Sequence, residues 1–193
     1  MATTHISTHN RGVKPAVSSV PADRSARPLA VLRITTGLVF LWAFLDKAFG
    51  LGYSTPGAKS WFSGGSPTKG FLGHVEVGPF QSMFRGWAGA AWADGFFMLG
   101  LFAVGLALVF GIGLRIAAVS GALMMLMMWA AEWPLAQHTS TGAATGSTNP
   151  LIDYHVIYAI VVIVVAYAAA GDTWGFGRQW KALPFVSANK WLS

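Results

Sequence analysis

The sequence predicts an all-α membrane protein: a polytopic bundle of four transmembrane helices with a long outer first loop that contains short interfacial helices. Three observations favour this fold class. Hydrophobic residues make up 54% of the 193 residues and charged residues only 10%, whereas a soluble domain carries about 25% charged residues. Four segments approach the roughly 20 apolar residues with which a helix crosses the hydrocarbon core. Most Lys and Arg residues lie beside these segments, where they act as topology signals.

The four predicted spans cover residues 29–49, 95–112, 116–135 and 153–171. Only residues 113–115 link the second and third spans, so these two must form an antiparallel hairpin. The chain therefore divides into a tail of residues 1–28, a membrane domain of residues 29–171 and a second tail of residues 172–193. The first tail lacks the apolar core of a signal peptide, and we prefer a flexible cytoplasmic tail to a transit peptide. The second mixes Trp and Phe with Arg and Lys, which is typical of an interfacial anchor.

The positions of the cations predict the orientation. The two tails and the link between the second and third spans are basic, whereas the loop of residues 136–152 has no Lys or Arg. The positive-inside rule then places both termini in the cytoplasm of a multi-pass plasma-membrane protein. The first loop, residues 50–94, lies outside, where it could form a lid over the bundle, and it carries three cations: Lys59, Lys69 and Arg85.

Composition also excludes several chemistries. The chain has no cysteine, which removes disulfides, iron–sulfur clusters, c-type haem and dithiol redox chemistry. The formal net charge of +6 reflects topology, so we expect no nucleic-acid partner. The methionines of residues 124–128 point in different directions around a helix and indicate packing. We therefore predict no metal site, and no haem.

Ionisable residues gather at the predicted outer ends of all four spans: Asp46, Lys47, Asp94, Glu132, Asp153 and His155. Asp94 and Asp153 lie at helix amino ends, where a carboxylate can simply cap free N–H groups. Asp46 and Glu132 lie near carboxyl ends, where a negative charge opposes the helix dipole. Each of these two needs a cation, a proton or a ligand. Adjacent helical residues point about 100° apart, so one of Asp46 and Lys47 faces the bundle interior.

Glu132 and His155 each leave two interpretations open. Glu132 lies between Trp129 and Trp133, so it is either an ordinary interfacial residue or a partly desolvated carboxyl group that exchanges protons. His155 begins the fourth span, where it either bonds to a neighbour or contacts a quinone carbonyl and relays a proton.

The segment "RITTGLVFLWAFLDKAFG", with Arg33, Gly37, Phe40 and Lys47, resembles the first span of the DoxX/DoxD family of small four-helix membrane proteins. The pattern "GYSTPGAKSWFSGGSPTKGFL…GPF", the following hairpin and "NPLIDYHVIYAI" resemble the branch identified as the membrane subunit of thiosulfate:quinone oxidoreductase. The resemblance covers roughly residues 29–180. It implies a quinone-linked electron-transfer role in sulfur or thiol redox metabolism, and it leaves a second subunit open.

Three functional hypotheses follow. In the first, the chain is a redox membrane subunit that binds quinone. Its catalytic residues are Glu132, His155 and Asp46, its quinone-binding residues are Lys47, His155, Trp129 and Asp153, and its anion-attracting residues are Lys59, Lys69 and Arg85. In the second, it is a non-catalytic scaffold that recruits a soluble redox enzyme. The third, a small transporter, has no inverted repeat in its favour. The lipid bilayer is the expected partner in each case, and a homo-oligomer is left open.

Overall fold

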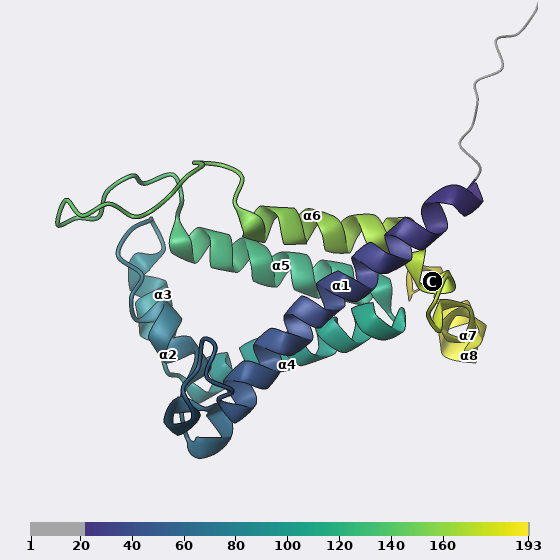
Figure 1. The fold of residues 1–193 in the computed structure, drawn as a ribbon, viewed down its shortest axis with the longest axis horizontal. Coiled ribbons are helices and arrows are strands. Elements are labelled where there is room, and N and C mark those ends of the chain that lie inside the picture. The colour runs from purple at the N-terminus through teal and green to yellow at the C-terminus, as the bar shows by residue number, and fades with distance from the viewer. Residues whose placement is uncertain (1–21, 193) are drawn as a thin grey trace, which may run out of the picture.

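The computed structural model describes residues 22–192, and these residues are helical with no strand among them. Four long helices dominate: α1 (Ala22–Phe49), α4 (Ala91–Phe110), α5 (Leu114–Glu132) and α6 (Tyr154–Tyr167). In Figure 1, α1 crosses α4, and α5 runs beside α6. Two short helices, α2 (Pro67–Leu72) and α3 (Gln81–Trp87), lie in the first loop, and α7 (Gly177–Ala182) and α8 (Pro184–Ser187) follow α6.

Three of the long helices are long and apolar enough to cross a membrane: Arg24–Phe49, Ala91–Phe110 and Leu114–Glu132. A helix also satisfies its own backbone hydrogen bonds, which lipid cannot do. Large apolar side chains point away from the core along these helices; Phe96 is 72% exposed and Val119 is 59% exposed. The protein is therefore an all-helical membrane protein in contact with a lipid bilayer.

The fourth predicted span is shorter than the sequence indicates. The prediction covers residues 153–171, but α6 has 14 residues and ends at Tyr167, which corresponds to about 21 Å against a hydrocarbon core of about 30 Å. Ala169 has a left-handed backbone with φ of 48°, and a short 3-10 turn, η3 (Ala170–Asp172), follows. The run of alanines favours a longer helix, so tertiary contacts must end it.

Those contacts come from Arg33, which is fully buried in α1. Its guanidinium group donates to backbone carbonyl groups in the last turn of α4 and in the segment after α6: Leu108, Val109, Ala170, Thr173 and Trp174. The first two belong to the carboxyl end of α4, where the helix dipole favours a cation. Arg33 thus joins three elements and holds the chain after α6 in a turn.

Two further differences concern helix starts. The first helix begins at Ala22, seven residues before the predicted span, and includes Pro28; residues 1–21 of the predicted tail lie outside the described residues. Asp94 was predicted to cap the helix that it begins, but α4 has no side-chain cap. Asp94 Oδ1 instead accepts hydrogen bonds from Thr68 N at 2.9 Å and Thr68 Oγ1 at 2.6 Å. The carboxylate therefore ties α2 to α4.

The long loops, residues 50–90 and 133–153, share one end of the molecule, which we call the loop end. The opposite end, with the turn of residues 111–113, the amino end of α1 and helices α7 and α8, is the turn end (Figure 1). At the loop end, α2 and α3 lie between the amino end of α4 and the carboxyl end of α5 (Figure 1). Phe84 of α3 packs with Ala131 of α5 in a small apolar cluster, which secures these short helices.

Candidate functional site

An acid–histidine cluster forms where α5 ends and α6 begins. Asp153 caps α6, as the sequence predicted, because its Oδ1 accepts from Val156 N at 3.1 Å. Its second oxygen, Oδ2, lies 2.8 Å from His155 Nδ1. Glu132, the last residue of α5, brings Oε2 within 3.8 Å of the same nitrogen, and Tyr154 donates its hydroxyl hydrogen to Glu132 Oε1 at 3.0 Å. Two helix ends therefore assemble four ionisable side chains.

His155 is the most deeply buried member, with 1% of its side chain exposed. A carboxylate only accepts hydrogen bonds, so the contact with ionised Asp153 places a hydrogen on Nδ1. The other ring nitrogen, Nε2, is buried and has no hydrogen-bond partner within residues 22–192. Buried polar atoms are rarely left without a partner. Nε2 is thus available to accept a hydrogen bond or a proton.

A cleft of about 520 Å³ opens beside this cluster. One wall carries Glu132, Asp153 and Tyr154; the loop that follows α2 contributes His74 and Glu76. No Lys or Arg is among the described residues that line it. The walls are therefore acidic, so they would attract a cationic group, repel an anion and admit a neutral group.

An apolar cavity of about 600 Å³ lies between α4 and α5. Helices α2 and α3 cover one end of it, and it is open to the lipid side at the exposed side chains of Phe96, Leu99 and Leu123. Aromatic and methionine side chains make up much of its lining, among them Trp87, Phe96, Met124, Met127 and Met128. Phe71 lines both the cleft and the cavity. A polar compartment and an apolar compartment therefore meet at one side chain of α2.

Trp129 lies one turn before Glu132, and its Nε1 donates to Leu151 O at 3.1 Å. This bond fixes the segment that leads into α6, so Trp129 supports the cluster through the backbone.

Lys47 is half-buried and donates to Ser54 Oγ at 3.4 Å. It is the one charged residue among the described residues that line the apolar cavity. The structure thus separates Lys47 from Glu132 and His155.

Asp46 is the member of the Asp46–Lys47 pair that faces inward, since it is 1% exposed. Its carboxylate accepts from Tyr53 N at 3.1 Å, Ser54 N at 3.0 Å and Ser54 Oγ at 2.6 Å. Three hydrogen-bond donors of the first loop therefore stabilise the charge. Asp46 needs no proton or ligand, and it does not line the cleft.

The three predicted anion-attracting residues lie on three elements: Lys59 on the 3-10 turn η1 (Gly57–Lys59), Lys69 on α2 and Arg85 on α3. None of them lines the cleft beside Glu132 or the apolar cavity. The structure thus brings Glu132, Asp153 and His155 together and leaves the three cations outside that group.

The donors of Glu132, Asp153 and His155 lie within 4.8 Å of one another, which is compact enough for one metal ion. The nitrogen that would bind such an ion is His155 Nδ1, and it already contacts Asp153 at 2.8 Å. Hydrogen bonding therefore accounts for the arrangement of these three side chains, and we infer no metal centre from it.

The sequence did not indicate Tyr154 or Phe71 as site residues. Tyr154 adjoins both Asp153 and His155, so its position at the helix start was the available signal. Phe71 had no such signal in the sequence, because its role depends on where α2 lies against α5.

Comparisons with protein-family models, curated proteins and solved structures gave no match to this chain. The DoxX/DoxD resemblance therefore stays a prediction.

Proposed function

We propose that this protein is an integral membrane subunit of a quinone-linked oxidoreductase that acts in sulfur or thiol redox metabolism. One observation supports it above the others: an acid–histidine cleft and an apolar cavity meet at Phe71. A membrane quinone has the matching form, a polar ring on a long apolar tail. The ring would occupy the cleft and the tail the cavity.

The residues present fit such a ligand. Glu132 and Tyr154 in the cleft wall supply a carboxylate and a hydroxyl oxygen that can accept hydrogen bonds from the hydroxyl groups of the reduced ring. A bound quinone supplies an acceptor for two electrons and two protons. Asp153 both lines the cleft and contacts the buried imidazole of His155. When Nε2 takes up a proton, the Nδ1 proton can pass through Asp153 to the cleft.

The proposal includes a topology. All four long helices cross the plasma membrane, with α6 completed by the residues that flank it. The turn end is cytoplasmic by the positive-inside rule, since it carries the cations Arg24, Arg27, Arg115, Arg178, Lys181 and Lys190. The cleft then faces outward. A second subunit or a soluble redox enzyme would bring the electron donor to this face.

A non-catalytic scaffold is the second candidate, and one feature favours it. Asp46 and Asp94 both accept hydrogen bonds from loop residues, so two of the acids predicted at the outer ends stabilise the first loop. A scaffold would present this ordered loop to a redox enzyme. It would not require a ligand in the cleft.

The test is a quinone titration of the purified full chain in detergent, followed by tryptophan fluorescence, since Trp87 and Trp92 line the cavity. We expect saturable quenching that is tighter for quinones with isoprenoid tails than for tailless analogues. Glu132→Gln should weaken binding about tenfold, the effect of losing a hydrogen bond to a charged group. His155→Ala should also weaken binding, because Asp153 in the cleft wall loses the imidazole that it contacts.

Glu76→Gln is the matched control, because it makes the same chemical change in the cleft without contact to His155. It should leave binding within a factor of about two, in line with a surface substitution. Thermal stability in detergent should stay the same in Glu132→Gln and Glu76→Gln, whereas His155→Ala removes a fully buried side chain and should lower it. Absence of saturable binding, or binding that ignores both Glu132 and His155, would contradict the redox proposal and favour the scaffold.

A further inference from the structure

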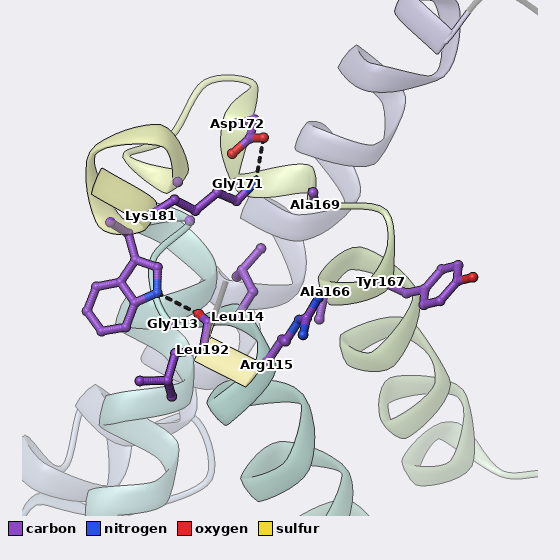
Figure 2. A pocket seen from close by; sticks show the side chains of 13 residues that line it. Gly113, Leu114, Arg115, Ala166, Tyr167, Ala169, Gly171, Asp172, Lys181 and Leu192 are labelled. Carbon is purple, nitrogen blue, oxygen red and sulfur yellow. Dashed lines mark hydrogen bonds and ion pairs between the residues drawn. The ribbon is translucent and has the colours of Figure 1, made fainter. Parts of the chain in front are cut away.

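A separate pocket of about 280 Å³ lies at the turn end, where the α4–α5 turn meets the end of α6 and helix α7 (Figure 2). Its lining includes Arg115, Lys181, Trp180 and Asp172, together with several glycines. It shares no lining residue with the cleft or the apolar cavity of the proposed quinone site. Its charge and location indicate a different ligand.

Arg115 lies in the first turn of α5, in the wall of the pocket. Its hydrogen bonds both leave from Nη1, to Lys190 O at 3.1 Å and Trp191 O at 3.5 Å. Nε and Nη2 thus keep their hydrogens for another acceptor. A guanidinium group with two parallel donors matches the oxygen spacing of a phosphate group.

The amino end of α5 adds backbone donors to the same pocket. Gly113 is the N-cap residue and makes no side-chain cap bond, and the first intrahelical bond runs from Ala117 N to Gly113 O at 3.0 Å. The N–H groups of the first turn therefore keep the partial positive charge of a helix amino end. Gly113, Leu114 and Arg115 all line the pocket, so this charge and that of Arg115 act on the same space.

Lys181 and Asp172 form an ion pair across the pocket, with Nζ 2.7 Å from Oδ2. The pair balances the charge of the one acid among the described residues that line the pocket, while Asp172 Oδ1 is buried and has no hydrogen-bond partner among those residues. Arg115 and Lys181 against Asp172 then leave one positive charge on the walls. The ligand is therefore expected to be an anion.

The surroundings of the pocket identify the source of that anion. It lies beside the ends of two candidate membrane spans, α4 and α5. Aromatic side chains around it are strongly exposed, with Tyr167 at 94%, Trp174 at 60% and Trp191 at 58%. Tyr and Trp concentrate at the depth of lipid head groups. A ligand at this depth comes from the lipid leaflet.

We propose that this pocket binds the phosphate of an anionic phospholipid head group, with Arg115 as the main contact and the amino end of α5 as a second. The positive charge on the walls favours an anionic lipid over a zwitterionic one, since the cationic group of the latter would be repelled. The bound lipid would link the α4–α5 turn to the C-terminal segment.

Native mass spectrometry of the full chain, released from nanodiscs that mix phosphatidylglycerol and phosphatidylcholine, tests the proposal by counting the retained lipids. We expect the unmodified chain to retain phosphatidylglycerol selectively. Arg115→Gln should lower the apparent affinity about tenfold. Arg178→Gln is the matched control, because Arg178 is an exposed cation of α7 that does not line the pocket. It should behave as the unmodified chain does.

Arg115→Lys serves as a second variant in case Arg115→Gln fails to fold, since it keeps the charge but loses the paired donors. It should weaken retention by a smaller factor than Arg115→Gln. Equal losses in Arg115→Gln and Arg178→Gln would overturn the proposal, because they would show a diffuse attraction. Thermal protection by inorganic phosphate that equals protection by phosphatidylglycerol and depends on Arg115 would also overturn it, since the ligand would then be soluble phosphate.

Discussion

Arg33 offers the sharpest test of the fold. The substitution Arg33→Met keeps a long side chain in α1 but removes every donor that the guanidinium group offers. Five backbone carbonyl groups lose their contact: Leu108, Val109, Ala170, Thr173 and Trp174. The carbonyl groups of Leu108 and Ala170 are buried, whereas the other three are partly buried and can recover bonds to water.

The expected cost follows from the two buried acceptors. Each costs about 1–3 kcal/mol when it loses its partner, or about 2–6 kcal/mol together. The burial of a charge is itself unfavourable by several kcal/mol, so its removal offsets part of this loss. We expect the free energy of unfolding to fall by about 2–4 kcal/mol.

Unfolding of the purified chain in mixed detergent and dodecyl sulfate micelles, followed by circular dichroism, measures this change. Arg33→Lys keeps the charge with fewer donors. Its free energy of unfolding should lie between those of the unmodified chain and Arg33→Met. Arg27→Met is the control, because Arg27 is exposed on the same helix, and it should change stability by no more than about 0.5 kcal/mol. If Arg33→Met proves as mild as Arg27→Met, the role given to Arg33 is wrong.

Two further predictions concern the first loop and the contact between α1 and α4. Asp94→Ala should destabilise the protein by about 1–3 kcal/mol, because the buried Thr68 N–H loses its acceptor. Amide hydrogen exchange at Thr68 should become faster. An unchanged exchange rate would contradict the contact between α2 and α4. Gly105→Ala should destabilise the protein by about 1–3 kcal/mol through overpacking, since an added Cβ would lie 2.7 Å from Leu41 Cγ. Gly95→Ala is the control, because an added Cβ there meets open space in the same helix; it should be neutral or stabilising by up to about 1 kcal/mol. Equal melting temperatures for Gly105→Ala and Gly95→Ala would contradict the close approach of α1 to α4 at Gly105.

The sequence predicted much of the helical layout because apolar length and flanking charge are local signals. It placed the ends of three membrane helices within four residues, except that the first helix begins seven residues earlier than predicted. It also placed Glu132, Asp153 and His155 at one end of the bundle, since the direction of each span fixes which ends meet. Their contacts within 3.8 Å confirm that proximity. Their role in proton exchange stays a prediction.

What the sequence could not predict depends on contacts between distant segments. Asp46 was expected to need a proton or a ligand, but backbone donors of the first loop satisfy it. The fourth helix was expected to continue to residue 171, but Arg33, from the first helix, bonds the carbonyl groups that follow it. Neither contact leaves a periodic pattern. The apolar cavity likewise arises from the placement of α2 and α3, which single-sequence patterns do not fix.

Photoaffinity labelling with an azidoquinone that carries an isoprenoid tail would locate the ligand in the proposed quinone site. Peptide mapping by mass spectrometry should find the label near Phe71 and on α5 between Met124 and Glu132, and an excess of unmodified quinone should prevent it. Label that excess quinone does not displace, or that maps to the lipid-facing side of α1, would contradict a quinone site between the cleft and the cavity.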